Sequence, residues 1–222
     1  MRHFRNAKKF VFSRRAPDLP DEMAAAPDTA VLFEPRDILI TERLIEGARI
    51  ENRAAGTLRI ESSILEGVSL AGSSFASIIW KDVRLVRCDL ANLETRYLTL
   101  TRVELIDCRM TGFRAGEANC QDILVSAGDQ RHCQLRFSKF KSAEFDSCNF
   151  AEADFQGTDL SGSIFRKCTL RNTEMSKVRL LNADLRGSLI EGLRMNAEDV
   201  RGAVVDPSQA MIFASLLGIR IE

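Results

Sequence analysis

Large apolar residues recur at every fifth position over most of this chain. Reading every fifth residue from Ile60 to Val205 gives 30 positions, of which 26 are large and apolar. The column two residues earlier is mostly small or aliphatic, as at Ser73 and Cys88, and the two columns together contain one charged residue, Glu198. Because 28% of the whole chain is charged, this segregation predicts that both columns face inward.

Two inward residues separated by one outward residue follow the alternation of a β-strand, in which side chains switch faces with a period of two. Since five is odd, the chain must turn a corner in each repeat to restore its phase. Turn-forming residues stand two positions after the large apolar residue, as at Gly67, Asn92 and Gly157. Four corners close one coil, so residues 46–205 are expected to form an all-β solenoid of about eight coils around a filled interior without a pocket.

Several repeats also carry a recognisable consensus. Residues 88–92 read Cys-Asp-Leu-Ala-Asn, residues 153–157 read Ala-Asp-Phe-Gln-Gly and residues 183–187 read Ala-Asp-Leu-Arg-Gly. These runs are similar to the pentapeptide-repeat family, and the resemblance covers about 160 of the 222 residues. It implies a right-handed quadrilateral β-helix that works by presenting its surface to a partner.

The terminal segments fall outside the periodic pattern. Residues 1–29 have a basic start, three prolines and no apolar periodicity, so we expect a flexible basic tail, either plainly solvated or in contact with nucleic acid or lipid. Residues 30–50 are expected to form an N-terminal cap of irregular first turns, and residues 51–205 the pentapeptide-repeat β-helix. Residues 206–222 form a C-terminal module.

The C-terminal module has the signals of a short helix. Asp206 is a good N-cap, Pro207 fits the first helical position, and Gly218 ends a helix over residues 208–217. Because this helix is apolar nearly all round, one side is expected to cap the last coil and the other to meet a second copy of the chain. The module also resembles the C-terminal dimerisation module of the gyrase-protecting, quinolone-resistance members of the family. The predicted dimer interface is Met211, Ile212, Ala214, Ser215, Leu217 and Ile219.

One stretch departs from the repeat. Within Ser126–Gln134, Gly128 takes the small inward position and Gln130 the large one, which predicts a bulged corner or local loop that is either structural or read by a partner. Outward aromatic residues elsewhere are candidate contacts, since aromatic side chains are enriched in binding hot spots. The candidate partner patch is Tyr97, Phe137, Asp129, Arg131 and His132.

Composition limits the chemistry. Lys and Arg total 31, as do Asp and Glu, so no net charge favours nucleic acid or a membrane. The six cysteines include no CxxC pair, and those of the inward column are expected to be reduced core residues. The sequence shows no signal-peptide core, no membrane span and no metal-ligand spacing. We therefore expect a cytoplasmic protein without cofactor, metal or catalytic residues.

Three classes of function compete on this reading. A homodimeric protein-interaction scaffold requires only the features above. A DNA mimic that binds DNA gyrase or another type II topoisomerase is the alternative implied by the family resemblance, but 19 basic against 20 acidic residues over 61–205 disfavour it. An enzyme is the third class, and no nucleophile with a base, carboxylate pair or phosphate loop supports it.

Overall fold

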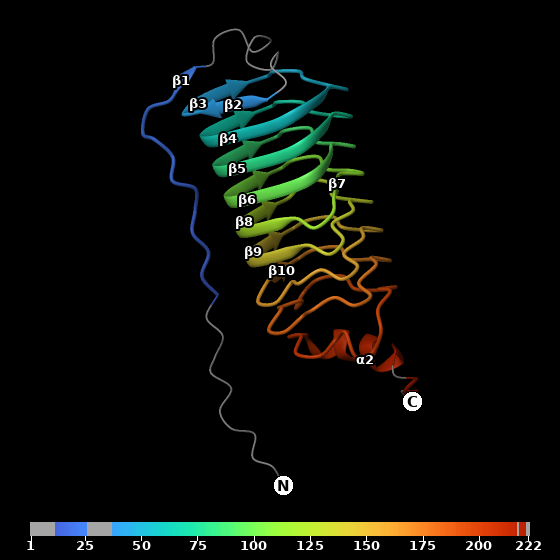
Figure 1. Ribbon diagram of the computed structural model, residues 1–222. Coiled ribbons are helices and arrows are strands. Elements are labelled where there is room, and N and C mark those ends of the chain that lie inside the picture. The colour runs from blue at the N-terminus through green and yellow to red at the C-terminus, as the bar shows by residue number, and fades with distance from the viewer. Residues whose placement is uncertain (1–11, 26–36, 217, 221–222) are drawn as a thin grey trace.

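The computed structural model describes residues 12–25, 37–216 and 218–220. Within these residues the chain forms a stack of parallel coils that ends in a helix (Figure 1). The elements are β1 (Ala24–Ala25), β2 (Ile38–Thr41), β3 (Arg43–Glu46), β4 (Ala54–Glu66), β5 (Ser74–Val86), β6 (Glu94–Ile106), β7 (Arg114–Ala115), β8 (Asn119–Ser126), β9 (Lys139–Asp146), β10 (Ile164–Arg166) and α2 (Pro207–Leu216). The predicted all-β solenoid with a C-terminal helix is confirmed.

Residues twenty apart lie side by side throughout the stack. Trp80 pairs with Leu100 and Leu100 with Cys120, all in parallel register. On another side, bridges connect Arg49 stepwise to Leu189, which gives seven steps of twenty residues between eight stacked positions. The solenoid therefore makes about seven turns, in agreement with the prediction of about eight coils.

The four-sided coil follows from its left-handed corner residues. In one coil, positive φ angles occur at Arg102, Asp107, Gly112 and Glu117, at 52°, 52°, 70° and 55°, and the next coil starts the series again at Asp122. Each left-handed residue reverses the strand alternation, so the two inward positions on every side are restored. Non-glycine residues rarely adopt this conformation, and here the stacked ladders on both sides hold them in it.

Aromatic stacking fills the second half of the interior. The rings of Phe145 and Phe165 are parallel within 23°, with centroids 4.6 Å apart, and Phe150 meets Phe145 edge to face at 5.3 Å. All three side chains are buried. Because stacked coils place these residues in two neighbouring inward columns, the five-residue spacing of phenylalanine becomes a continuous aromatic core.

Hydrogen bonds to the preceding coil hold the small inward column. The Thr158 hydroxyl donates to the Leu135 carbonyl at 2.6 Å, and the Cys148 thiol donates to the Val125 carbonyl at 3.2 Å. Serine, threonine and cysteine therefore fill this column interchangeably. All six cysteines are free and buried, which confirms the prediction of reduced core residues, and burial raises the pKa of Cys120 to about 12.

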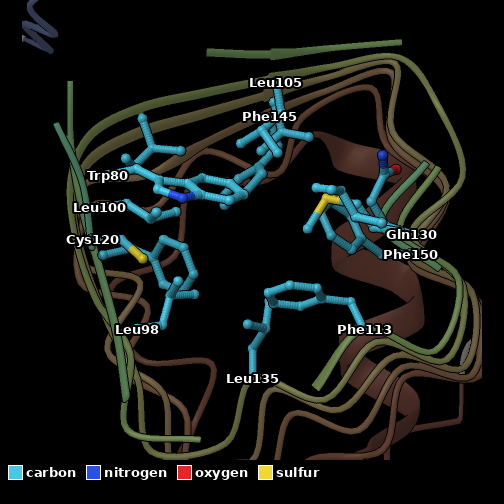
Figure 2. Close-up of a pocket in the computed structure, with 15 residues that line it drawn as sticks. Trp80, Leu98, Leu100, Leu105, Phe113, Cys120, Gln130, Leu135, Phe145 and Phe150 are labelled. Carbon is cyan, nitrogen blue, oxygen red and sulfur yellow. The ribbon is translucent and has the colours of Figure 1, made fainter. Parts of the chain in front are cut away.

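The interior is not completely filled, which corrects the prediction of a column without a pocket. An apolar cavity of about 40 Å³ lies among side chains that include Trp80, Leu100 and Cys120 (Figure 2). It arises because Cys120 occupies the large inward column, where its neighbours along the stack are Leu100 and Phe140. The cavity is far smaller than the pockets of roughly 300–1,000 Å³ that bind small molecules.

The segment Ser126–Gln134 keeps the repeat register, so the predicted loop is absent, but its corner is irregular, because Ala127 and Gly128 both have positive φ angles, of 60° and 85°. Bridges keep Asp129 in register with the coils on both sides. The Gln130 side chain is buried, but its Nε2 donates to the carbonyls of Ala127 (2.9 Å) and Cys108 (3.3 Å), and its Oε1 accepts the Asn149 N–H (3.1 Å). Because the buried amide has hydrogen-bond partners, its burial carries little penalty, and the chain does not need a loop to expose it to solvent.

The regular register starts before the predicted boundary at residue 51. Ile38 lies beside Leu58, and Ile45 lies beside Leu65. Residues 37–50 therefore form part of a regular coil instead of irregular turns, while residues 30–36 lie outside the described part of the chain. The predicted start of the repeats lies too far along the chain. Ala55 interrupts the large inward column, but the column is already present before it, at Ile45.

The N-terminal segment, residues 12–25, differs from the predicted flexible tail. It runs along one edge of the stack (Figure 1), and Arg14 and Arg15 form ion pairs of 3.1 Å with Glu104 and Asp122. Its basic residues therefore contact acidic side chains of the same chain. Residues 1–11 and 26–29 of the predicted tail lie outside the described residues.

Candidate interaction surfaces

Tyr97 and Phe137 lie on one corner of the solenoid, two coils apart. Each side chain is 57% exposed. The Arg96 guanidinium carbon lies 5.4 Å from the centre of the Tyr97 ring. The Phe137 ring covers Gly157, where an added Cβ would lie 2.5 Å from Phe137 Cδ1. Both aromatic rings are thus held on a rigid corner while most of their surface remains available.

The polar members of the candidate patch lie on another side of the coil. Asp129 and Arg131 form an ion pair of 2.7 Å, and the Arg131 guanidinium holds the pKa of Asp129 below its ordinary value. His132 Nδ1 is 3.6 Å from Glu152 Oε2. Because His132 and Phe137 are left-handed corner residues separated by a full side, the predicted patch divides into an aromatic corner and a separate ionic corner.

Outward charges on the sides pair between neighbouring coils. Arginine and carboxylate alternate along these columns, and each pair joins residues twenty apart. Exposed ion pairs of this kind stabilise by about 0–1 kcal/mol, so their main effect is local neutralisation of the acidic side chains. The exposed pairs include Arg109–Asp89, Arg179–Asp159 and Arg194–Glu174.

The helix α2 starts with two reciprocal hydrogen bonds. Asp206 Oδ1 accepts the Gln209 N–H at 2.9 Å, and Gln209 Oε1 accepts the Asp206 N–H at 3.0 Å, which is the capping-box arrangement. The Ser208 hydroxyl and backbone N–H groups lower the pKa of Asp206 to about 2. Gln209 Nε2 donates to the carbonyls of Leu185 and Ser188, and so fixes the helix on the last coil.

One side of α2 covers the solenoid and another remains open. Gln209 and Phe213 are buried against the last coil, whereas Met211 is 52% exposed and Ile219, just beyond the helix, is 54% exposed. An apolar surface of this kind at a rod end is available to a second copy. Of the predicted interface residues, the exposed ones are Met211, Ser215 and Ile219, the half-buried ones are Ile212 and Ala214, and Leu217 lies outside the described residues.

Comparison with known families identifies the repeat. A family model for pentapeptide repeats matches residues 131–166 and 155–192, with 8 copies. The coils before and after these residues keep the same five-residue phase and twenty-residue register. Residues 131–192 match the pentapeptide-repeat family. None of the curated proteins compared matches it.

Solved pentapeptide-repeat structures are among the similar chains. A trypsin-treated variant of QnrB1, a plasmid-mediated fluoroquinolone resistance protein, has 18% identity and a TM-score of 0.37, over 84% of this chain and 98% of that one. Full-length QnrB1 has 17% identity and a TM-score of 0.29, over 82% and 100%. The pentapeptide-repeat protein Rfr23 from the cyanobacterium Cyanothece 51142 has 13% identity and a TM-score of 0.22, over 77% and 92%.

Two contacts outside the repeats were missed by sequence reasoning. Gln209 follows Asp206 by three residues, which is the capping-box spacing and was a readable signal. Arg14 and Arg15 gave no signal beyond their charge, because their partners are 90 and 107 residues away. Among the described residues, no cluster of histidine, cysteine and carboxylate side chains has metal-site geometry, and no helix has the length and hydropathy required to cross a membrane.

Proposed function

We propose that this chain is a non-enzymatic, homodimeric pentapeptide-repeat scaffold that binds a protein partner. The observation that carries the proposal is the aromatic corner, where Tyr97 and Phe137 are each 57% exposed on a rigid stack. Rigid aromatic side chains contribute large contact areas at low entropic cost, and they dominate many binding hot spots. The interior contributes only a cavity of about 40 Å³, so the surface is the part of the solenoid suited to recognition.

The alternative, a DNA mimic that binds DNA gyrase, requires a different surface. Such a protein would present acidic side chains in place of phosphates, and its partner would be held by charge. Here several acidic side chains of the outward columns pair with arginines one coil away, as Asp159 does with Arg179. The near-balance of charge therefore favours the scaffold over the mimic.

Capture of the partner tests the scaffold. We expect the tagged protein to retain a partner from its native host's lysate at both low and moderate ionic strength, because apolar contacts are not screened by salt. The double variant Tyr97→Ala with Phe137→Ala should lose that partner. The control Leu181→Ala removes a side chain that is 53% exposed elsewhere on the solenoid, and it should retain the partner. Recovery of gyrase subunits mainly at low salt would favour the alternative.

Sedimentation equilibrium tests the homodimer. At micromolar concentration we expect a mass of twice 24.8 kDa. The double variant Met211→Glu with Ile219→Glu should be monomeric, because it places charges in the proposed interface. The control Leu39→Glu changes a side chain that is 66% exposed in β2, at the other end of the stack, and should remain dimeric. A monomeric wild type would contradict this part of the proposal.

A further inference from the structure

A column of alternating charge follows one corner of the solenoid. Asp82, Arg102 and Asp122 are left-handed residues twenty apart. Arg102 donates to both carboxylate oxygens of Asp82, at 2.5 and 2.6 Å. Two residues further along the side, Glu104 pairs with Arg84 at 2.9 Å. We call Asp82, Glu104 and Asp122 the acidic edge.

The repeat does not supply enough cations for the acidic edge. The next coil places Ser142 after Asp122 and Leu124 after Glu104, and neither side chain can pair with a carboxylate as arginine does. Yet Glu104 is 5% exposed and Asp122 is 4% exposed. Within the coils each of these carboxylates has one polar partner, Arg84 for Glu104 at 2.9 Å and Gln121 Nε2 for Asp122 at 3.3 Å. A carboxylate covered by further chain is stabilised by a second charged partner.

The N-terminal segment supplies the missing partners. Arg14 Nη2 lies 3.1 Å from Glu104 Oε1. Arg15 contacts both oxygens of Asp122, with its Nε 3.1 Å from Oδ2 and its backbone N 3.3 Å from Oδ1. Each arginine thus occupies the place of the next cation in an alternating column.

A backbone contact fixes the direction of the N-terminal segment on the edge. The Asp18 N–H donates to Asp82 Oδ1 at 2.9 Å. Burial raises the pKa of Asp82, but Arg102 and the Asp18 N–H together lower it by more, so its pKa lies below the ordinary value. The segment therefore runs opposite to the growth of the stack, from the coil of Asp122 back to that of Asp82 (Figure 1).

The attachment consists of few contacts. The Arg15 side chain is 64% exposed even while paired, whereas the Arg14 side chain is 15% exposed. Further along the segment, β1 pairs with only two residues of β3, Arg43 and Leu44. The described segment is therefore held by a few side-chain and backbone contacts, in contrast to the continuous ladders between coils. A segment held in this way can be replaced by another of the same chemistry without disturbing the solenoid.

We propose that the acidic edge is a docking track for an extended peptide of a partner protein that carries two adjacent arginines, and that residues 14–18 of this chain occupy the track until that peptide displaces them. This inference rests on the proposed scaffold function. It adds the acidic edge as a second binding surface and a pair of arginines as the chemical group that this surface recognises in the partner. Two adjacent arginines reach Glu104 and Asp122, and the backbone N–H of the residue three positions later reaches Asp82. The attached segment acts as an internal competitor, so the track selects against weak basic ligands.

The test compares three full-length proteins. They are the wild type, the double variant Arg14→Gln with Arg15→Gln, and a control, Arg171→Gln with Arg179→Gln, which removes the same charge from exposed pairs in later coils. The probe is a fluorescently labelled synthetic peptide with the sequence of residues 12–20, and binding is measured by fluorescence anisotropy. Hydrogen exchange is followed at residues 12–25 in the same samples.

We expect the Arg14 and Arg15 variant to bind the probe at least about tenfold more tightly than the wild type or the control. In those two proteins the attached segment competes at an effective concentration that is typically millimolar. Hydrogen exchange at residues 12–25 should increase in the Arg14 and Arg15 variant alone. Adding Glu104→Gln to that variant should cancel its gain in affinity, with thermal unfolding recorded to show that the protein remains folded.

Equal probe affinity in all three proteins would overturn the proposal. So would equal binding of a second probe in which both arginines are replaced by glutamine, because the track would then not read the guanidinium groups. The readout does not involve Tyr97 or Phe137. Failure here therefore leaves the scaffold proposal standing, and failure of the lysate capture leaves probe binding measurable.

Discussion

Replacing Phe145 by alanine is expected to lower the free energy of unfolding by about 3–5 kcal/mol. The ring is 1% exposed, stacks on Phe165 at 4.6 Å, and meets Phe140 and Phe150 edge to face at 5.7 and 5.3 Å. Removing it leaves a cavity in the middle of the stack, where coils on both sides prevent collapse. Urea unfolding followed by circular dichroism measures the change.

The matched control for Phe145 is Phe137, which carries the same side chain on the outside. Since Phe137 is 57% exposed, its replacement by alanine should change the free energy of unfolding by less than about 0.5 kcal/mol. Comparable losses at Phe137 and Phe145 would show that the aromatic column does not carry the stability assigned to it.

Replacing Gly128 by alanine is expected to cost at least about 2 kcal/mol. An added Cβ would lie 2.1 Å from the carbonyl oxygen of Cys108 and 2.9 Å from its carbonyl carbon, and the residue has a φ of +85°. The neighbouring atoms belong to the backbone of the preceding coil, so the two coils would have to separate. Urea unfolding reports the loss, and near-ultraviolet circular dichroism reports the altered packing.

Two other glycines separate the causes of that loss. Gly47 has a φ of +62° but no atom within 4 Å of an added Cβ, so its replacement by alanine measures the left-handed backbone alone, at about 1 kcal/mol. Gly116 has its nearest neighbour at 3.9 Å and should tolerate alanine with little change. If alanine at Gly128 costs no more than at Gly47, the close approach of the coils would not be the reason for glycine there.

The parts of the fold that could be read from the sequence are those that repeat. The five-residue columns predicted which residues face inward, because charged residues are excluded from the narrow interior in every repeat. They also placed Tyr97 and Phe137 on the outside. The C-terminal helix was predictable from Asp206 and Pro207, since capping depends on neighbouring residues alone.

The parts that could not be read depend on single departures from the repeat. Gln130 looked like a break in the coil, because two of its three hydrogen-bond partners, Cys108 and Asn149, belong to the preceding and following coils and are hidden in a linear reading. The cavity beside Cys120 depends on the volume of one residue against its two stacked neighbours. By contrast, the separation of His132 from Phe137 was readable, because each stands two positions after a large inward position, at 130 and 135, and therefore at a different predicted corner.

The path of the N-terminal segment was the largest omission. Its contacts depend on where the alternating charge columns lack a cation, at Leu124 and Ser142. Neither residue is unusual by itself, and a basic segment rich in proline is usually solvated. Only the three-dimensional stack shows that Arg14 and Arg15 pair with carboxylates 90 and 107 residues further along the sequence.

That path also has a consequence for the order in which the protein assembles during synthesis. Each coil can close on its predecessor through a loop of twenty residues, so the stack can grow as the chain emerges. The N-terminal segment has no complete binding surface until the coil containing Asp122 has formed, 107 residues after Arg15. Because closing longer loops costs more entropy and non-local contacts form later, residues 14–18 precede the coils in the sequence but are among the last to reach their native contacts.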